Sequence, residues 1–118
     1  MRMVEIEVNN DQGVYQLIVN GQIDASSSIH LDNAISIAVE QREKQIIVDC
    51  SGLSYISSAG LGVFISYLED FKNNKTQFVI FGLNARVKHV FELIGLESLF
   101  TIVPTKDDAI SYLNDSQA

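Results

Sequence analysis

The sequence is short of the residues that several classes of protein require. Its 118 residues include one cysteine, one proline and no tryptophan. The single cysteine, Cys50, excludes an internal disulfide and is typical of a protein from a reducing compartment. No apolar run is long enough to span a bilayer, and no N-terminal stretch has the pattern of a secretory signal. We therefore expect a cytoplasmic protein with no membrane segment.

Positive charge is also scarce. The chain has 8 Lys and Arg residues against 15 Asp and Glu residues, which gives a formal net charge of −7, and its basic residues are not clustered. Binding to nucleic acid or to an anionic membrane surface requires a basic patch, so we expect neither. With 47% apolar and 19% charged residues, the composition indicates a folded chain. The length favours a single domain over residues 1–118.

The motifs of common catalytic and nucleotide-binding sites are missing. The glycines of the G-x-S-x-G nucleophile motif are absent around Ser57 and Ser58, and the only histidines, His30 and His89, are expected on helix surfaces. Gly60-Leu61-Gly62 begins a G-x-G pattern without its third glycine, so we interpret these glycines as sites of close packing. One cysteine and scattered carboxylates offer no metal site. We expect no catalytic residues, no metal and no cofactor, and hence no enzyme.

The most informative stretch runs from Ile46 to Phe71. Its first residues, 46–48, are apolar and β-branched and predict a buried strand, whereas the small and hydroxyl residues of 49–56 predict a loop. From Ser58 onward, apolar residues at three- and four-residue steps predict a helix. A serine at such a junction serves either as a helix cap, because its hydroxyl accepts an N–H bond, or as a phosphorylation site, because the helix start stabilises a phosphate. The pattern alone leaves both readings open.

The rest of the chain predicts an α/β fold. Residues 3–8 and 14–19 read as two strands of an N-terminal hairpin with a loop longer than two residues, and Asp24 with the following serines predicts a helix start. Strands and helices then alternate in the order ββαβαβαβα, which implies a mixed, mostly parallel sheet with about four helices. If the strands before Asp24 and before Ser57 and Ser58 are parallel neighbours, these residues lie on one edge of the domain.

Three segments carry a family resemblance. Residues 49–62, DCSGLSYISSAGLG, resemble the signature of STAS domains, specifically those of the bacterial anti-sigma factor antagonists. Residues 21–24, GQID, resemble the G-x-I/L-D motif of the family, and residues 87–100 resemble its third helix and last strand. The resemblance covers nearly the whole chain and implies the STAS fold.

The resemblance also implies a partner-switching mechanism. The unphosphorylated antagonist binds an anti-sigma factor that is also a serine kinase, and so frees a sigma factor. Phosphorylation of one serine at a helix start releases it, and a protein phosphatase resets it. In this sequence the phosphorylated serine falls on Ser58, with Ser57 as the minor alternative, and Asp24 matches an acidic residue implicated in the kinase contact. The partner-binding residues expected on this basis are Asp24, Ser57, Ser58, Ala59, Gly60 and Leu61, on a monomer or weak dimer.

Two positions depart from the family pattern. Antagonists commonly have Asp immediately before the phosphorylated serine and Ser or Thr after it, whereas this chain has Ser57 and Ala59. A second interpretation therefore stays open: a STAS scaffold or adaptor subunit of a signalling or transport complex that works without phosphorylation. An enzyme with a bound small molecule ranks third.

Overall fold

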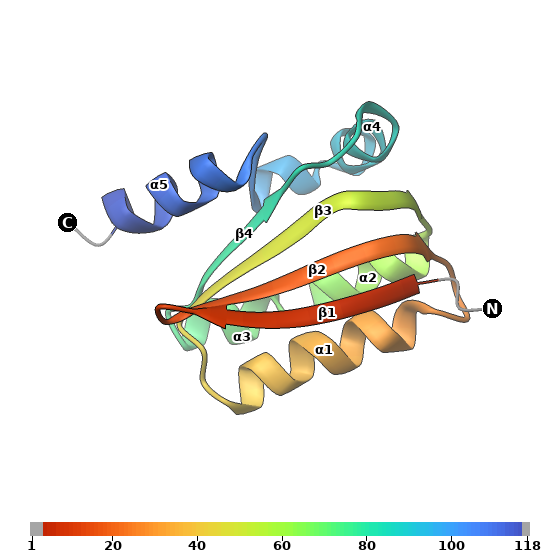
Figure 1. The fold of residues 1–118 in the computed structure, drawn as a ribbon. Helices are drawn as coiled ribbons and strands as arrows, with labels where there is room; N and C mark the ends of the chain where they lie inside the picture. The colour runs from red at the N-terminus through yellow and green to blue at the C-terminus, as the bar shows by residue number, and fades with distance from the viewer. Residues whose placement is uncertain (1–3, 117–118) are drawn as a thin grey trace.

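The secondary structure follows the predicted order of strands and helices. The computed structural model describes residues 4–116 and is shown in Figure 1. Its elements, in chain order, are β1 (Val4–Asp11), β2 (Val14–Ile23), α1 (Ser28–Glu40), β3 (Gln45–Ile56), α2 (Ser58–Ser66), α3 (Leu68–Asn73), β4 (Gln77–Phe81), α4 (Ala85–Ile94), the 3-10 helix η1 (Leu96–Ser98), β5 (Thr101–Val103) and α5 (Lys106–Ser116).

The strands form one 5-stranded sheet in the order β1-β2-β3-β4-β5. β1 and β2 are antiparallel, and every later pair of neighbours is parallel. The prediction of an α/β fold with an N-terminal hairpin and a mostly parallel sheet is thus confirmed. Because each parallel neighbour requires a crossover, a helix follows each of β2, β3 and β4.

The two faces of the sheet are covered unequally. Helices α1, α2 and α3 lie on one face, and α5 lies on the other, near β4 (Figure 1). The larger core joins the first face to these helices and to α4, with Phe64 and Phe91 among its fully buried side chains. The smaller core packs Ala109 and Leu113 of α5 on Ile47, Val79 and Phe81.

The N-terminal hairpin is tighter than predicted. β1 continues to Asp11, and only Gln12 and Gly13 form the turn, so the expected longer loop is wrong. Both turn residues have positive φ, 53° and 83°, as in a type I′ turn. Residues 9–11 are polar, which suggests a loop in the sequence. They are exposed on an edge strand, and such a strand tolerates polar side chains.

The central strand is longer than predicted. Residues 49–56 belong to β3 instead of a loop, because β2 pairs with β3 as far as Ile23 and Ile56. The small residue Gly52 has a packing role there: a Cβ built on it would lie 1.8 Å from Oδ1 of Asn20. The amide of Asn20 therefore fills the space beside this glycine. Small residues that suggest a loop serve here to admit a neighbouring side chain.

The helix predicted after Ser58 is divided at Tyr67 into α2 and α3. The Ser66 hydroxyl donates to the carbonyl of Val63 at 2.6 Å, and the Tyr67 amide donates to the carbonyl of Phe64 at 3.2 Å. Both bonds span three residues and tighten the last turn of α2. The Tyr67 hydroxyl also donates to the carboxylate of Asp32 in α1, which anchors the junction to the neighbouring helix.

The C-terminal elements agree closely with the sequence. Gly95 adopts the left-handed conformation that favours glycine at the end of α4, with φ of 82°. At the start of α5, the Asp108 amide donates to Oγ1 of Thr105 at 3.1 Å, and the threonine thereby caps the helix. The last strand begins at Thr101, after η1.

Candidate functional site

Two strand-to-helix loops meet at one edge of the sheet. β2 and β3 are parallel neighbours, and Ile23 and Ile56 form the last pair of their ladder. One residue further on, the Ser57 amide donates to the carbonyl of Ile23 at 2.8 Å. The loop that begins at Asp24 and the start of α2 are thus joined by a backbone hydrogen bond. The two strands are parallel neighbours, and the two loops lie on one edge, as the sequence predicted for that case.

The serine pair at the start of α2 divides two roles between its members. Ser57 is the N-cap: its backbone is extended, with φ of −89° and ψ of 173°, and its hydroxyl accepts the Gly60 amide at 3.4 Å. Ser58 is the first residue of the helix, and its side chain is exposed. The sequence left open whether Ser58 is a cap. The structure assigns the cap to Ser57, which leaves the Ser58 hydroxyl at the surface.

Two of the predicted contact residues are buried. Gly60 packs so closely that a Cβ on it would lie 2.7 Å from side-chain carbons of both Ile23 and Ile56. Leu61 is 2% exposed and belongs to the main core. These two residues support the surface and are not available for side-chain contact with a partner. Gly62, by contrast, has nothing within 4 Å of a built Cβ, so the expectation of close packing is confirmed for Gly60 alone.

The remaining candidates, Asp24, Ser57, Ser58 and Ala59, form what we call the Ser58 surface. Ser58 and Ala59 are exposed, whereas Asp24 and Ser57 are half-buried. The surface combines one carboxylate, two hydroxyls and one methyl group. The imidazoles of His30 and His89 do not belong to this set and lie exposed on other helices, as predicted.

Asp24 shapes the loop in which it lies. Its Oδ1 accepts the Ser26 hydroxyl at 2.7 Å, the Ser26 amide at 2.9 Å and the Ser27 amide at 3.0 Å. The hydrogen bond from the Ser26 hydroxyl, followed by that from the Ser27 amide, lowers the pKa of the Asp24 carboxyl below its usual value. Asp24 therefore carries a negative charge beside the start of α2 and also holds the chain in the shape that leads into α1.

The other chemically active side chains do not form a second centre. Cys50 is fully buried in β3, and desolvation raises the pKa of its thiol, so it behaves as a small apolar residue. Among residues 4–116, no group of three or more His, Cys, Asp and Glu residues is arranged to hold a metal ion. No helix within that range is both long and apolar enough to cross a membrane.

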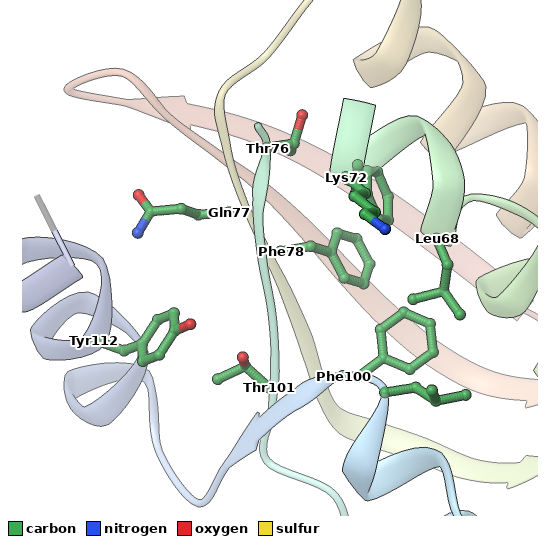
Figure 2. Close-up of a pocket in the computed structure, with 10 residues that line it drawn as sticks. Leu68, Lys72, Thr76, Gln77, Phe78, Phe100, Thr101 and Tyr112 are labelled. Atoms are coloured by element: carbon green, nitrogen blue, oxygen red, sulfur yellow. The ribbon is translucent and has the colours of Figure 1, made fainter. Parts of the chain in front are cut away.

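A hollow in the described surface lies away from the Ser58 surface. It has a volume of about 430 Å³ and lies where β4 and β5 begin, whereas Ser58 follows the end of β3. Figure 2 shows Phe78, Phe100 and Leu68 gathered on one side of β4, with Lys72 beside them and Tyr112 across the strand. Sequence reasoning missed this hollow. Its phenylalanines come from separate elements, and each reads in the sequence only as a core residue.

Comparisons with known proteins agree with this fold. The STAS domain profile matches residues 5–109. The anti-sigma-B factor antagonist of Staphylococcus aureus strain NCTC 8325 / PS 47 is 26% identical over 99 residues, which cover 84% of this chain and 92% of that protein.

Two solved structures show the same fold. An anti-sigma factor antagonist from Mycobacterium paratuberculosis superposes with a TM-score of 0.87 at 24% identity, over 94% of both chains. The phosphorylated form of the Bacillus cell fate determinant SpoIIAA superposes with a TM-score of 0.70 at 18% identity, over 92% of this chain and 99% of that one. The sheet order, the two-loop edge and the profile match over most of the sequence lead to one assignment: the chain belongs to the STAS domain family.

Proposed function

We propose that this STAS domain is an anti-sigma factor antagonist of the cytoplasm. In its unphosphorylated form it binds an anti-sigma factor that is also a serine kinase, and a sigma factor is thereby freed for transcription. Phosphorylation of Ser58 releases the antagonist, and a protein phosphatase restores the binding form. The domain itself performs no catalysis in this scheme.

The observation that carries the proposal is the exposed Ser58 hydroxyl at the first position of α2. A phosphate at this position lies at the positive end of the helix dipole and near the free amides of the first turn. The neighbouring hydroxyl of Ser57 is half-buried and already accepts the Gly60 amide. Ser58 is therefore the better acceptor of the two, which supports the choice of Ser58 over Ser57.

The charge of the phosphate supplies the switch. Phosphorylation adds about 1.5 to 2 negative charges, and Asp24 already places one carboxylate on the same surface. Enclosing such a charge in an interface without a cation opposite costs several kcal/mol, on the order of a thousandfold in affinity. A partner that packs on the exposed side chains of Ser58 and Ala59 is therefore displaced when the phosphate is added.

The proposal is tested by recovering partners from native cytosol. We expect the wild-type protein and Ser58→Ala to retain an ATP-binding serine kinase, and Ser58→Asp to lose it, as identified by mass spectrometry of the bound proteins. Incubation with ATP should release the kinase from wild type but not from Ser58→Ala. Equal recovery of the kinase by Ser58→Asp and wild type would contradict the switch.

Asp24→Asn tests the second contact. An asparagine keeps the Oδ1 acceptor that the Ser26 and Ser27 amides require, so the loop retains its shape while the charge is lost. We expect this variant to fold as wild type and to bind the kinase at least about tenfold more weakly, as expected for the loss of one charged contact. Unchanged affinity would remove Asp24 from the contact.

A scaffold or adaptor role is the second candidate, and the departures Ser57 and Ala59 favour it. The hydroxyl of Ser57 stands where antagonists commonly carry an acid, so the surface has one charge fewer than the family pattern. A scaffold would copurify in a large complex, take up no phosphate on Ser58 in extract, and bind equally as Ser58→Asp. These three measurements separate it from the antagonist.

A further inference from the structure

The outer edge of β1 offers unpaired backbone groups. β1 is the first strand of the sheet, and within residues 4–116 no other strand lies beyond it; Figure 1 shows it in red at the free edge. The two-residue turn makes Asp11 and Val14 a hydrogen-bonded pair, so odd-numbered residues of β1 bond to β2. The amides and carbonyls of Val4, Ile6 and Val8 consequently point outward.

An apolar groove runs beside these groups. It lies between β1 and α1, has a volume of about 340 Å³, and is lined by Val4, Ile6, Val8, His30, Ala34 and Ile37. Val8 is 52% exposed and Ile37 is 47% exposed, which is high for side chains of their size. A strand added to the edge would direct alternate side chains into this groove, where apolar ones bury the most surface.

The opposite face of β1 is acidic. Glu5, Glu7 and Asp11 alternate with the groove residues and are all exposed. Opposite charges stabilise directly facing residues of neighbouring strands, and like charges destabilise them. The remaining side chains of an added strand would face these carboxylates, so basic residues fit there.

A second copy of the chain does not fit this edge. If β1 paired antiparallel with itself about Ile6, Glu5 of each copy would face Glu7 of the other, which places two pairs of carboxylates in contact. The same glutamates therefore discourage self-association at an edge strand of 8 residues. The occupant favoured by charge is a different chain.

We infer that the edge of β1 is a docking site for an extended segment of a partner protein in which apolar and basic residues alternate. The segment adds antiparallel to β1, places its apolar side chains in the groove beside α1, and faces Glu5 and Glu7 with its basic ones. No residue that lines this groove belongs to the Ser58 surface, so the domain could hold one protein here while the proposed switch acts on another.

The probe is a capped peptide of alternating Lys and Val as long as β1, labelled for fluorescence anisotropy. We expect it to bind the full chain and to slow hydrogen exchange at the amides of Val4, Ile6 and Val8. A Glu-Val peptide should not bind. Methylation of the backbone nitrogens of the Val residues, which face β1 in the antiparallel arrangement, should abolish binding. Methylation of the backbone nitrogens of the Lys residues, which face away from β1, should preserve it.

Matched variants separate charge at the edge from overall charge. Glu5→Gln with Glu7→Gln should weaken binding about fivefold through two lost cross-strand pairs, and Glu92→Gln with Glu97→Gln, exposed on α4 and η1, should change it by less than about twofold. Ser58→Asp should bind the peptide as wild type does, so this test and that of the switch fail independently.

Three results would overturn the inference. The first is that the peptide does not bind, or that it binds without changing the hydrogen-exchange rates of the β1 amides. The second is equal weakening by the two pairs of charge variants. The third is a wild-type dimer formed through β1, which would make a second copy the occupant.

Discussion

At the scale of single residues, the two neighbouring serines should differ in their effect on stability. Ser57→Ala removes the N-cap of α2 and should lower the free energy of unfolding by about 0.5–1 kcal/mol, at the low end for a cap because the bond to the Gly60 amide is 3.4 Å long. Ser58→Ala should change it by less than about 0.5 kcal/mol. Urea denaturation of the two variants checks this, and the reverse order would place the cap on Ser58.

The two glycines of α2 form a second matched pair. Gly60→Ala forces a methyl group against Ile23 and Ile56 and should destabilise the fold by about 1–3 kcal/mol. Gly62→Ala meets open space within a helix and should stabilise it by about 0.5–1 kcal/mol, because alanine is the better helix former. Thermal unfolding with matched buffer gives both values. Equal effects would mean that α2 can move away from the sheet.

Tyr67 should give the fold a pH dependence above neutrality. Burial, helped by the hydrogen bond to Asp32, raises the pKa of Tyr67 from 10.0 to about 12. Since the folded value lies above the unfolded one, the unfolded state loses this proton first. The contribution of the protonated Tyr67 hydroxyl to the free energy of unfolding is complete below pH 10 and is lost as the pH rises to 12. Urea unfolding should show a steeper decline for wild type than for Tyr67→Phe over that interval, and parallel declines would refute it.

At the scale of elements, the hairpin turn is a site for stabilisation. Gln12 adopts φ of 53°, a left-handed conformation that asparagine tolerates better than glutamine. Gln12→Asn creates the Asn-Gly pair preferred by type I′ turns and should raise the free energy of unfolding by roughly 0.5 kcal/mol. Gln16→Asn, at a buried position of β2, provides a contrast and should destabilise. A loss of stability in Gln12→Asn would argue against the type I′ turn.

The elements could be predicted where local patterns and tertiary contacts agree. The alternation in β1, the left-handed Gly95 and the cap of α5 depend on nearby residues, so the local sequence is enough to indicate each of them. The second half of β3 could not be recognised, because residues 49–56 owe their extended form to the pairing with β2. A strand held by a neighbour distant in sequence leaves little trace in its own composition. The break at Tyr67 is similarly set by a contact with α1.

The candidate site could be predicted in position but not in detail. The capping hydroxyl and the parallel topology together placed Asp24 beside the serine pair. Which serine caps α2 depends on the residue at which the helix begins, and hydrophobic periodicity does not define a helix start to within one residue. The burial of Gly60 and Leu61 could not be predicted either. A sequence motif includes the buried residues that support a surface as well as the exposed residues that form it, and does not distinguish them.

At the scale of the whole molecule, Cys50 reports on global unfolding. Its side chain is fully buried in the central strand, and desolvation with the nearby Asp49 raises the pKa of the thiol, so a thiol reagent should label it only after unfolding. Labelling should therefore accelerate about two- to fivefold in Ser57→Ala, in line with the loss of 0.5–1 kcal/mol. A labelling rate that is independent of stability would indicate a local opening of β3.

The hydrogen bond between the Ser57 amide and the Ile23 carbonyl has a consequence for the proposed phosphorylation of Ser58 by a kinase. It holds Ser57, the residue before the proposed acceptor Ser58, at a preformed helix end, so the Ser58 hydroxyl is presented on a folded surface and not on a flexible segment. A synthetic fragment copying residues 52–64 would lack that scaffold and should be a poor acceptor. The kinase of the proposed switch would then recognise the folded domain, and unfolded copies of the protein would stay unphosphorylated.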